Sequence, residues 1–491
     1  MVRLKTFVVR GFWFSMALAF LAPVAANAQF NEALLLSQDP LPSGSRGMAM
    51  GGSLISAADG VDALEFNPAA LALLPRNDFT LSLFNRGYSS DAEFLGMSSD
   101  ASQSQFSLSS IGIAYKYPTV VGHFATGISF DRVQDYTSSY SFSAVNKNSS
   151  LFNTQGFLQQ LPSGDDLAYD LGLTYDIPSS GPYTFTTPFS GGNLETGTVN
   201  TSGGLNAVRL GGGVDIAEGV SVGATLNILF GEYDYVRNYT ESNVNNIAYD
   251  TGSAAPANFQ TATITDAVHQ DQSGYSIKLG LLVKESIVNF GLTLETPQYM
   301  HIDETSSRSG VADFGGPSPV EYAGSFSDAE SYDVITPLKL GAGASVHALG
   351  FTGSASVSYT NLSNLQFENS SVDMTAENQM ASDSLRAVLS WQLGAEYKIP
   401  GIGIALRAGF DYEPSPYKGD PSSYDTKIIS AGLGIPIGKR FAIEAVYRHS
   451  SYNTIHNIYQ MVEGETSPGD ANITSDNVDI NDVAMTFQYK F

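Results

Sequence analysis

Residues 389–411 read LSWQLGAEYKIPGIGIALRAGFD. Apolar side chains alternate with small or polar ones on both sides of Pro400-Gly401. A period of two is typical of a β-strand with one apolar face, and two such runs around a turn predict a hairpin. The polar face carries Glu396, Lys398 and Arg407 among glycine and serine. Small and charged side chains together suit the lumen of a barrel whose outer face meets lipid.

The same alternation recurs in fourteen segments of the chain. They are residues 78–87, 105–117, 121–140, 203–216, 219–239, 273–283, 287–299, 333–348, 351–362, 385–399, 402–413, 425–437, 440–450 and 478–491. Short turns (118–120, 217–218, 284–286, 349–350, 400–401 and 438–439) alternate with longer polar loops, among them 141–202, 240–272, 301–332 and 451–477. Short turns at one end and long loops at the other are typical of an outer-membrane barrel.

The fold class predicted from this pattern is all-β, a 14-stranded antiparallel transmembrane β-barrel that spans residues 78–491. Residues 167–177 also alternate, with Leu171 and Leu173 on one face. We place them inside the longest loop, because a bacterial single-chain barrel has an even number of strands.

The composition excludes several classes of protein. The net charge is -25, and no basic stripe offsets it, so nucleic acid is not an expected partner. The chain has no cysteine, which excludes disulfides, thiolate zinc sites and iron–sulfur clusters. Only 15% of the residues are charged, while Phe and Tyr number 28 and 25, an unusual surface for a soluble enzyme of 491 residues.

Residues 1–28 have the form of a signal peptide. Arg3, Lys5 and Arg10 precede an apolar run, and Ala26-Asn27-Ala28 offers small residues to signal peptidase. The alternative is an uncleaved anchor, but the run is shorter than the ~20 residues that a spanning helix needs. The sequence therefore predicts export, with Gln29 as the mature N-terminus.

Residues 29–77 precede the barrel and do not alternate. Their glycines have neither of the spacings that cradle phosphate, and their apolar content is too high for a disordered linker. A hatch packed inside the barrel explains both the apolar residues and the glycines, because glycine lets backbone pass close to a crowded wall.

This segment carries a resemblance to a known family. The run Gly44-x-Arg46-Gly47-x-x-x-Gly51-Gly52, a later Ala-rich stretch with Asp59, and the motif Asn67-Pro68-Ala69 resemble the hatch of FadL-type outer-membrane transporters. Residues 407–417 resemble a late strand and loop of members from the Bacteroidetes. The resemblance implies a Gram-negative outer-membrane location and gating by Gly47, Gly51, Gly52, Asp59, Asn67, Pro68 and Ala69.

The resemblance also implies passive uptake of hydrophobic molecules, either long-chain fatty acids or neutral and aromatic hydrocarbons, with lateral release through the wall. Gly122 and Gly127, together with Asp131-Arg132, mark a kink in the third strand as a candidate opening. Barrel curvature is the alternative for the two glycines. For Asn67-Pro68-Ala69 the alternative is a structural turn, because Pro68 removes a donor and restricts Asn67.

Other chemistry is less well supported by the sequence. His449 and Ser451 share a strand face without an assignable acidic partner, and Asp476, Asp479 and Asp482 lack the EF-hand spacing for calcium. We therefore expect no catalytic residue, metal or cofactor.

Two functions remain open. One is the transporter, and the other is a non-transporting barrel that acts as a surface scaffold or secretion-machinery subunit. Expected partners are a hydrophobic small molecule, outer-membrane lipid and, through the terminal Phe491, the barrel assembly machinery. We expect a monomer.

Overall fold

The computed structural model describes residues 33–154, 167–176, 185–189, 191–247, 259–315, 321–370, 373–459 and 473–491. The predicted signal peptide, residues 1–28, lies outside the described residues. None of the described helices is both long and apolar enough to cross a bilayer.

Twenty strands occupy most of the described chain. They are β1 (Asp78–Phe94), β2 (Met97–Tyr117), β3 (Phe124–Asp135), β4 (Ser138–Asn146), β5 (Tyr175–Asp176), β6 (Phe185–Thr186), β7 (Asn193–Ala217), β8 (Val220–Ser242), β9 (Thr261–Glu285), β10 (Val288–Glu295), β11 (Tyr299–Asp313), β12 (Glu321–Ile335), β13 (Lys339–Ala348), β14 (Phe351–Asn361), β15 (Gln366–Glu368), β16 (Ala387–Lys398), β17 (Ala405–Glu413), β18 (Thr426–Ile437), β19 (Phe441–Asn457) and β20 (Ile473–Lys490).

Helical segments are short. They are α2 (Ser45–Ala49), η1 (Gly60–Asp62), α3 (Ala63–Phe66), η2 (Pro68–Leu73), η3 (Leu151–Asn153), α5 (Leu167–Asp170), η4 (Leu362–Asn364), α6 (Thr375–Ser384) and η5 (Ser422–Tyr424), and residues 33–37 are helical as well.

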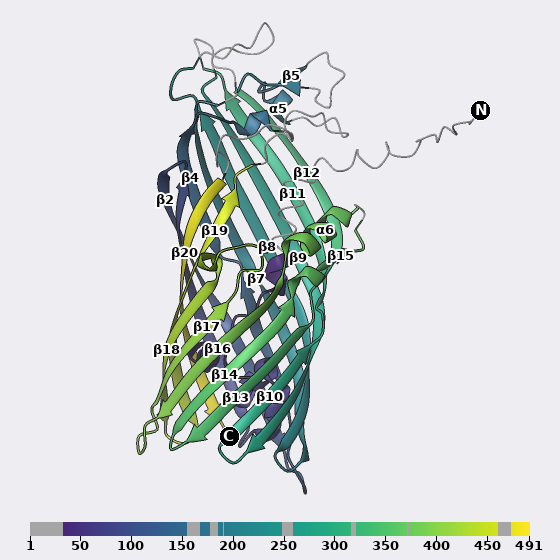
Figure 1. Cartoon of the computed structure of the whole chain (residues 1–491), viewed down its shortest axis with the longest axis vertical. Coiled ribbons are helices and arrows are strands. Elements are labelled where there is room, and N and C mark those ends of the chain that lie inside the picture. Colours follow the sequence, from purple (N-terminus) through teal and green to yellow (C-terminus); the bar gives the residue numbers. More distant parts are fainter. Residues whose placement is uncertain are drawn as a thin grey trace, which may run out of the picture.

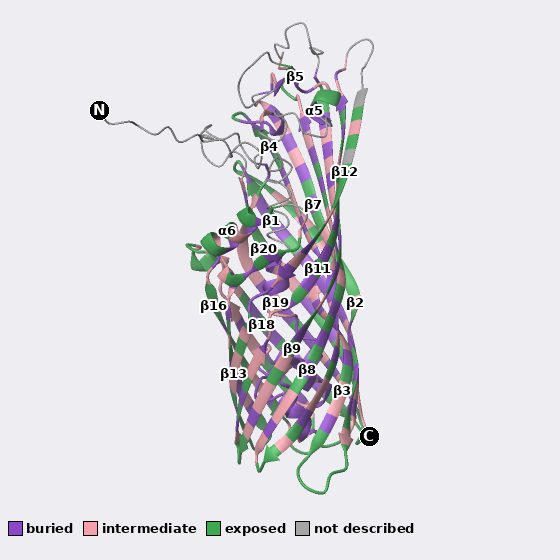
Figure 2. Ribbon diagram, turned by 90° about the vertical axis from the view of Figure 1, so that its right-hand side faces the viewer, coloured by how far each residue is buried: buried purple, intermediate pink, exposed green. Residues whose placement is uncertain are grey.

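The strands form a closed antiparallel barrel with fourteen wall positions, as the alternation predicted. Each wall position, here called a stave, is filled by one strand or by two consecutive strands of the same direction. β3 with β4, β10 with β11, and β12 with β13 each make one interrupted stave, and β1 pairs with β20 to close the cylinder. Burial alternates along each strand between a luminal and an outer face (Figure 2). The described part of the predicted segment 167–177, residues 167–176, contributes α5 and the short β5 of a separate two-stranded sheet, so it adds no stave.

The wall is uneven in height. β7, β8, β9, β11 and β12 rise far above β13, β14, β16, β17 and β18, and α6 lies over the lower side (Figure 1). The described residues of the hatch, from residue 33 to η2, run through the barrel interior, and Met48, Leu54 and Leu71 are fully buried there.

Several predicted loop boundaries are wrong. Residues 88–104, outside the predicted strands, are mostly strand, since β1 and β2 are joined only by Leu95-Gly96. The predicted loops 141–202, 240–272, 301–332 and 451–477 likewise shrink, because their flanking strands continue upward. These extensions stand above the membrane, so their outer face is polar and gives no hydrophobic alternation, while pairing with neighbouring strands still holds them extended.

The hatch-filled lumen as the candidate functional site

Arg46 ties the hatch to the barrel wall. Its Nη1 donates to Ala57 O (3.1 Å) and pairs with Asp59 Oδ1 (3.2 Å), both within the hatch. Its Nε lies 3.3 Å from Glu396 Oε2 on β16. Glu396 also accepts from Arg407 Nε at 2.6 Å, and Arg407 Nη2 reaches Glu444 Oε1 at 2.7 Å. Asp59, predicted from the sequence, is thus an anchor of Arg46, and its gating role stays a prediction.

The Asn67-Pro68-Ala69 motif shapes a turn and docks it on the wall. Asn67 Oδ1 accepts from Ala69 N (3.1 Å), which caps η2, and Pro68 begins that helix. The Asn67 amide donates to Ile55 O (2.9 Å) in the hatch and to Leu281 O (3.1 Å) on β9. These contacts are those of the structural alternative raised by the sequence, and they leave the gating hypothesis untested.

Glycines let the hatch touch the wall backbone. A Cβ on Gly51, whose φ is +61°, would lie 2.8 Å from Phe410 N on β17. A Cβ on Gly47 would lie 2.9 Å from the ring of Phe66, which is also in the hatch. Gly52 has a φ of +75°, a conformation that side chains disfavour. The three predicted glycines are therefore explained by close approach and backbone conformation, and a gating role for them stays a prediction.

The interruption of the third stave lies above Gly122 and Gly127. Gly122 is in the turn before β3, and Gly127 is an ordinary paired position beneath Leu64. The register shifts at Arg132–Gln134, and the stave breaks between β3 and β4. Above Ser110, β2 pairs only with β1, while β4 pairs only with β7. The register shift thus lies next to Asp131-Arg132, with Gly122 and Gly127 below it, and a lateral opening at this strand stays a prediction.

Charged side chains bridge hatch and wall on the opposite flank. Arg209 Nη1 contacts Asp131 Oδ2 at 2.7 Å and Glu65 Oε2 of α3 at 3.7 Å. Lys278 Nζ donates to Glu65 O at 2.7 Å and pairs with Glu295 at 3.1 Å. Sequence reasoning missed these residues, although acids and bases at luminal positions of several strands were the available signal.

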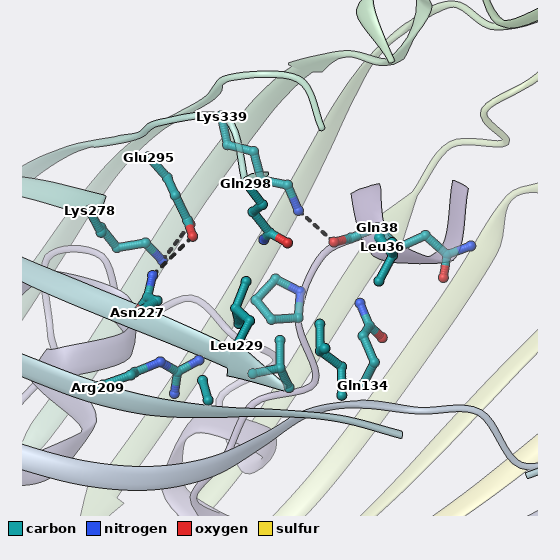
Figure 3. Close-up of a pocket in the computed structure, with 14 residues that line it drawn as sticks. Leu36, Gln38, Gln134, Arg209, Asn227, Leu229, Lys278, Glu295, Gln298 and Lys339 are labelled. Atoms are coloured by element: carbon teal, nitrogen blue, oxygen red, sulfur yellow. Dashed lines mark hydrogen bonds and ion pairs between the residues drawn. The ribbon is translucent and has the colours of Figure 1, made fainter. Parts of the chain in front are cut away.

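A small cavity lies in the lumen beside the hatch. It is polar, has a volume of about 20 Å³ and lies between Leu36, Arg209, Lys278, Glu295 and Lys339 (Figure 3). That volume holds about one water molecule. Above it, Leu34 and Leu36 pack into an apolar cluster with residues of β7, β8, β11, β12 and α6. A larger hollow of about 460 Å³ is lined by side chains such as Phe290 and Leu292, which are on the lipid-facing surface.

The BamG family model matches residues 179–446, more than half of the chain. The chain belongs to the BamG family.

Solved structures share the fold of this BamG-family chain. A Pseudomonas aeruginosa FadL homologue is 12% identical with a TM-score of 0.55, over 92% of this chain and 99% of that one. The P. putida toluene transporter TodX is 13% identical with a TM-score of 0.52, over 91% and 98%. The fold is thus that of a FadL-type barrel, and it points with the family to a Gram-negative outer membrane. No curated protein matches the chain.

The residues that the sequence offered for catalysis and for calcium binding make separate contacts in this BamG-family barrel. The contacts are His449 with Asp479 (3.5 Å), His456 with Asp476 (3.0 Å), and Arg86 with Asp482 (3.0 Å). In the part of the chain that the structure describes, no group of three or more such residues is arranged to hold a metal ion.

A crown of packed loop residues covers the tall side of the barrel. Phe189 lies 5.9 Å from Phe152 and 4.6 Å from Phe259, measured between ring centroids, and Phe259 lies 5.9 Å from Phe314. Leu151, Leu171 and Tyr239 are buried in the same cluster. This part of the BamG-family barrel therefore has a core of its own.

Two carboxylates are buried under the crown. Glu241 accepts from Leu151 N (2.8 Å) and Tyr239 OH (2.9 Å), and Glu195 accepts from Tyr459 OH (2.9 Å). No base lies within ion-pair distance of either carboxylate among the described residues. Burial raises the pKa of both groups, and the charge of Glu241 further raises the pKa of Glu195.

The crown should therefore loosen as the pH rises. A carboxyl whose folded pKa is raised binds more protons when folded, so its stabilisation is complete below the unfolded pKa and is lost as pH rises through the folded pKa. We expect hydrogen exchange at Leu151, corrected for intrinsic rate, to be slower at pH 5 than at pH 8. Glu195→Gln should flatten this dependence, because it removes one of the two charges. An unchanged slope in the variant would contradict the assignment.

Proposed function

We propose that the protein is a non-transporting outer-membrane barrel that serves as a scaffold or subunit of an outer-membrane assembly or secretion machinery. The observation that carries this proposal is the close packing of the hatch, and of the apolar residues above it, inside the barrel. The cavity beside the hatch has room for about one water molecule, the space above it is packed with Leu34, Leu36 and their neighbours, and the crown has its own core. Ligand sites for small molecules are typically ~300–1,000 Å³. Membership of the BamG family supports the same conclusion.

Under this proposal the hatch is a permanent structural core. Arg46, Asn67 and Gly51 join it to strands on several sides of the wall, which gives the barrel a rigid interior. The surfaces left for partners are then the polar outer face of the tall staves and the crown. The proposal also includes removal of residues 1–28 and recognition of Phe491, which is 42% exposed, by the barrel assembly machinery.

A second candidate is passive uptake of hydrophobic molecules, favoured by one specific observation. Above Ser110 no backbone ladder joins β2 to β4, and Ser141 Oγ, which donates to Asp100 O at 3.2 Å, links the two strands there. TodX, a toluene transporter, has the same fold. Transport would require the hatch and Leu34–Leu36 to move, and neutral hydrocarbons would suit the acidic chain better than fatty acids.

One experiment separates the two candidates. Cells with the gene deleted, and cells restored with wild type or Asn67→Ala, are compared for the abundance of other outer-membrane barrels and surface lipoproteins, and for uptake of labelled palmitate and toluene. We expect the deletion to deplete specific outer-membrane proteins while uptake stays unchanged. Loss of uptake with an intact outer-membrane proteome would overturn the scaffold proposal and establish transport.

A further inference from the structure

Two groups stand out among the cations of this acidic chain. Buried luminal arginines each contact a carboxylate, as shown by Arg46, Arg86, Arg209, Arg237, Arg407 and Arg448. Six cations at the short-turn end have no carboxylate within ion-pair distance among the described residues: Lys284, and the five near the C-terminal strand, Arg76, Lys116, Lys439, Arg440 and Lys490. Because the chain has 49 acids and only 24 Lys and Arg, five unpaired cations near one strand require an explanation.

Backbone contacts bring these five residues to one corner of the barrel. Asn77 joins three strands there, since its O accepts from Phe491 N (3.0 Å) and its Oδ1 accepts from Lys116 N (3.0 Å). Lys490 N donates to Arg440 O at 2.7 Å, and Arg76 Nη1 donates to Lys439 O at 3.2 Å. The corner is the seam formed by the paired strands β2, β1, β20 and β19. The C-terminus lies at this lower end of the barrel (Figure 2).

The rest of this rim is not basic in the same way. The turn between β7 and β8 carries Glu218, and the end of β9 carries Lys284 beside Glu285. Near the seam the negative groups are the Phe491 carboxylate, Asp78 and Asp59: Asp78 is buried and accepts from Val61 N and Gln488, and Asp59 pairs with Arg46 on the inner side. Positive charge is therefore concentrated at the seam.

Aromatic side chains flank the seam on the outer surface. On one side Tyr117 stacks with Phe124 (5.2 Å between centroids) and lies 5.0 Å from Tyr115. On the other side Tyr489 lies 4.6 Å from Phe441 and 5.5 Å from Phe491. Aromatic belts mark the level of lipid headgroups in membrane proteins. Lys116 and Lys490 occupy lumen-facing positions of β2 and β20. Arg76, Lys439 and Arg440, at the turns, are thus the cations at the depth where phosphates lie, with exposed apolar wall above them for acyl chains.

We propose that Arg76, Lys439 and Arg440, at the turns of this seam, bind the phosphate of an anionic phospholipid in the periplasmic leaflet. Basic clusters at a membrane surface attract anionic headgroups, and Arg is suited to bidentate contact with phosphate. The aromatic belts favour a lipid over an acidic periplasmic protein, because a soluble partner would meet the turn residues but not the lipid-facing rings. This inference stands independently of the proposed scaffold function.

The test uses the full mature chain in phosphatidylcholine nanodiscs that contain a minor fraction of phosphatidylglycerol. Native mass spectrometry then measures which lipids stay bound after release. Lys439→Gln/Arg440→Gln should bind phosphatidylglycerol about tenfold more weakly, with phosphatidylcholine unchanged. Lys418→Gln/Lys427→Gln is the matched control, since it removes the same charge at the opposite end of the barrel.

Three results would overturn the proposal. They are equal phosphatidylglycerol retention in both double variants, displacement of the lipid by inorganic phosphate at constant ionic strength, and photocrosslinking from position 439 in native membranes to protein but not to phospholipid. Heat-modifiable migration on gels shows whether each variant is folded, so a misfolded variant cannot imitate loss of the lipid.

Discussion

Replacing Glu396 with alanine is expected to destabilise the barrel by about 3–5 kcal/mol, the usual cost of removing one partner from a buried ion cluster. The Glu396 side chain is only 1% exposed and contacts Arg46, Arg407 and Lys398. Without it, Arg46 and Arg407 keep their charges in a low-dielectric lumen with fewer compensating carboxylates. The hatch should loosen along with the wall, because Arg46 belongs to the hatch.

The measurement is the temperature at which the folded, fast-migrating band converts to the unfolded band on a semi-native gel. Glu368→Ala is the control, since Glu368 is exposed and has no ion-pair partner among the described residues. Adding Arg407→Met to Glu396→Ala should recover part of the loss, because it removes one of the stranded charges. A conversion temperature for Glu396→Ala equal to that of the control would contradict the role assigned to the cluster.

The fourteen staves were predictable from sequence because lipid imposes a simple constraint. Every outward residue within the bilayer must be apolar, so strands such as β16 and β20 show a clean period of two. The alternation of short turns with long connections then gave the antiparallel order and the closure of the barrel.

The limits of the strands were less predictable because that constraint ends at the membrane surface. Above Tyr275 the outward face of β9 carries Asp271, His269 and Thr265, which a sequence pattern cannot distinguish from a loop. The interruptions between β10 and β11 and between β12 and β13 were not predicted. Residues 287–299 alternate well enough to predict one strand, yet Thr296–Gln298 separate β10 from β11, opposite Pro337 in the neighbouring stave.

The hatch was predictable as a packed segment but not in its contacts. Its apolar residues and glycines indicated close packing, and they are buried. Its anchors join residues far apart in the chain, such as Arg46 with Glu396 and Asn67 with Leu281. No local pattern encodes which wall residue meets which hatch residue, because register and barrel closure decide it.

Gly409→Ala is expected to open a water-filled path beside the hatch. A Cβ at this position on β17 would lie 2.2 Å from Gly51 N and 2.5 Å from Ser430 Oγ, so a backbone segment must move. The wall is constrained by pairing with β16 and β18, whereas residues 50–52 form a turn, so the hatch should give way. In planar bilayers we expect no ion conductance from the wild type and measurable conductance from Gly409→Ala. Cells that carry the variant should be more sensitive to vancomycin.

Gly87→Ala is the control, because the nearest atom to its added Cβ, Asn481 O, is 3.6 Å away and the strand has room for a methyl group. Heat-modifiable migration shows whether both variants are folded and inserted. If folded Gly409→Ala stays silent, the hatch and wall tolerate separation without opening a path, and the seal must lie in the apolar cluster around Leu34 and Leu36. If it conducts, contact between the backbones of the hatch and β17 is itself the seal. A rigid seal of that kind favours the scaffold, because a transporter's hatch has to yield to its ligand.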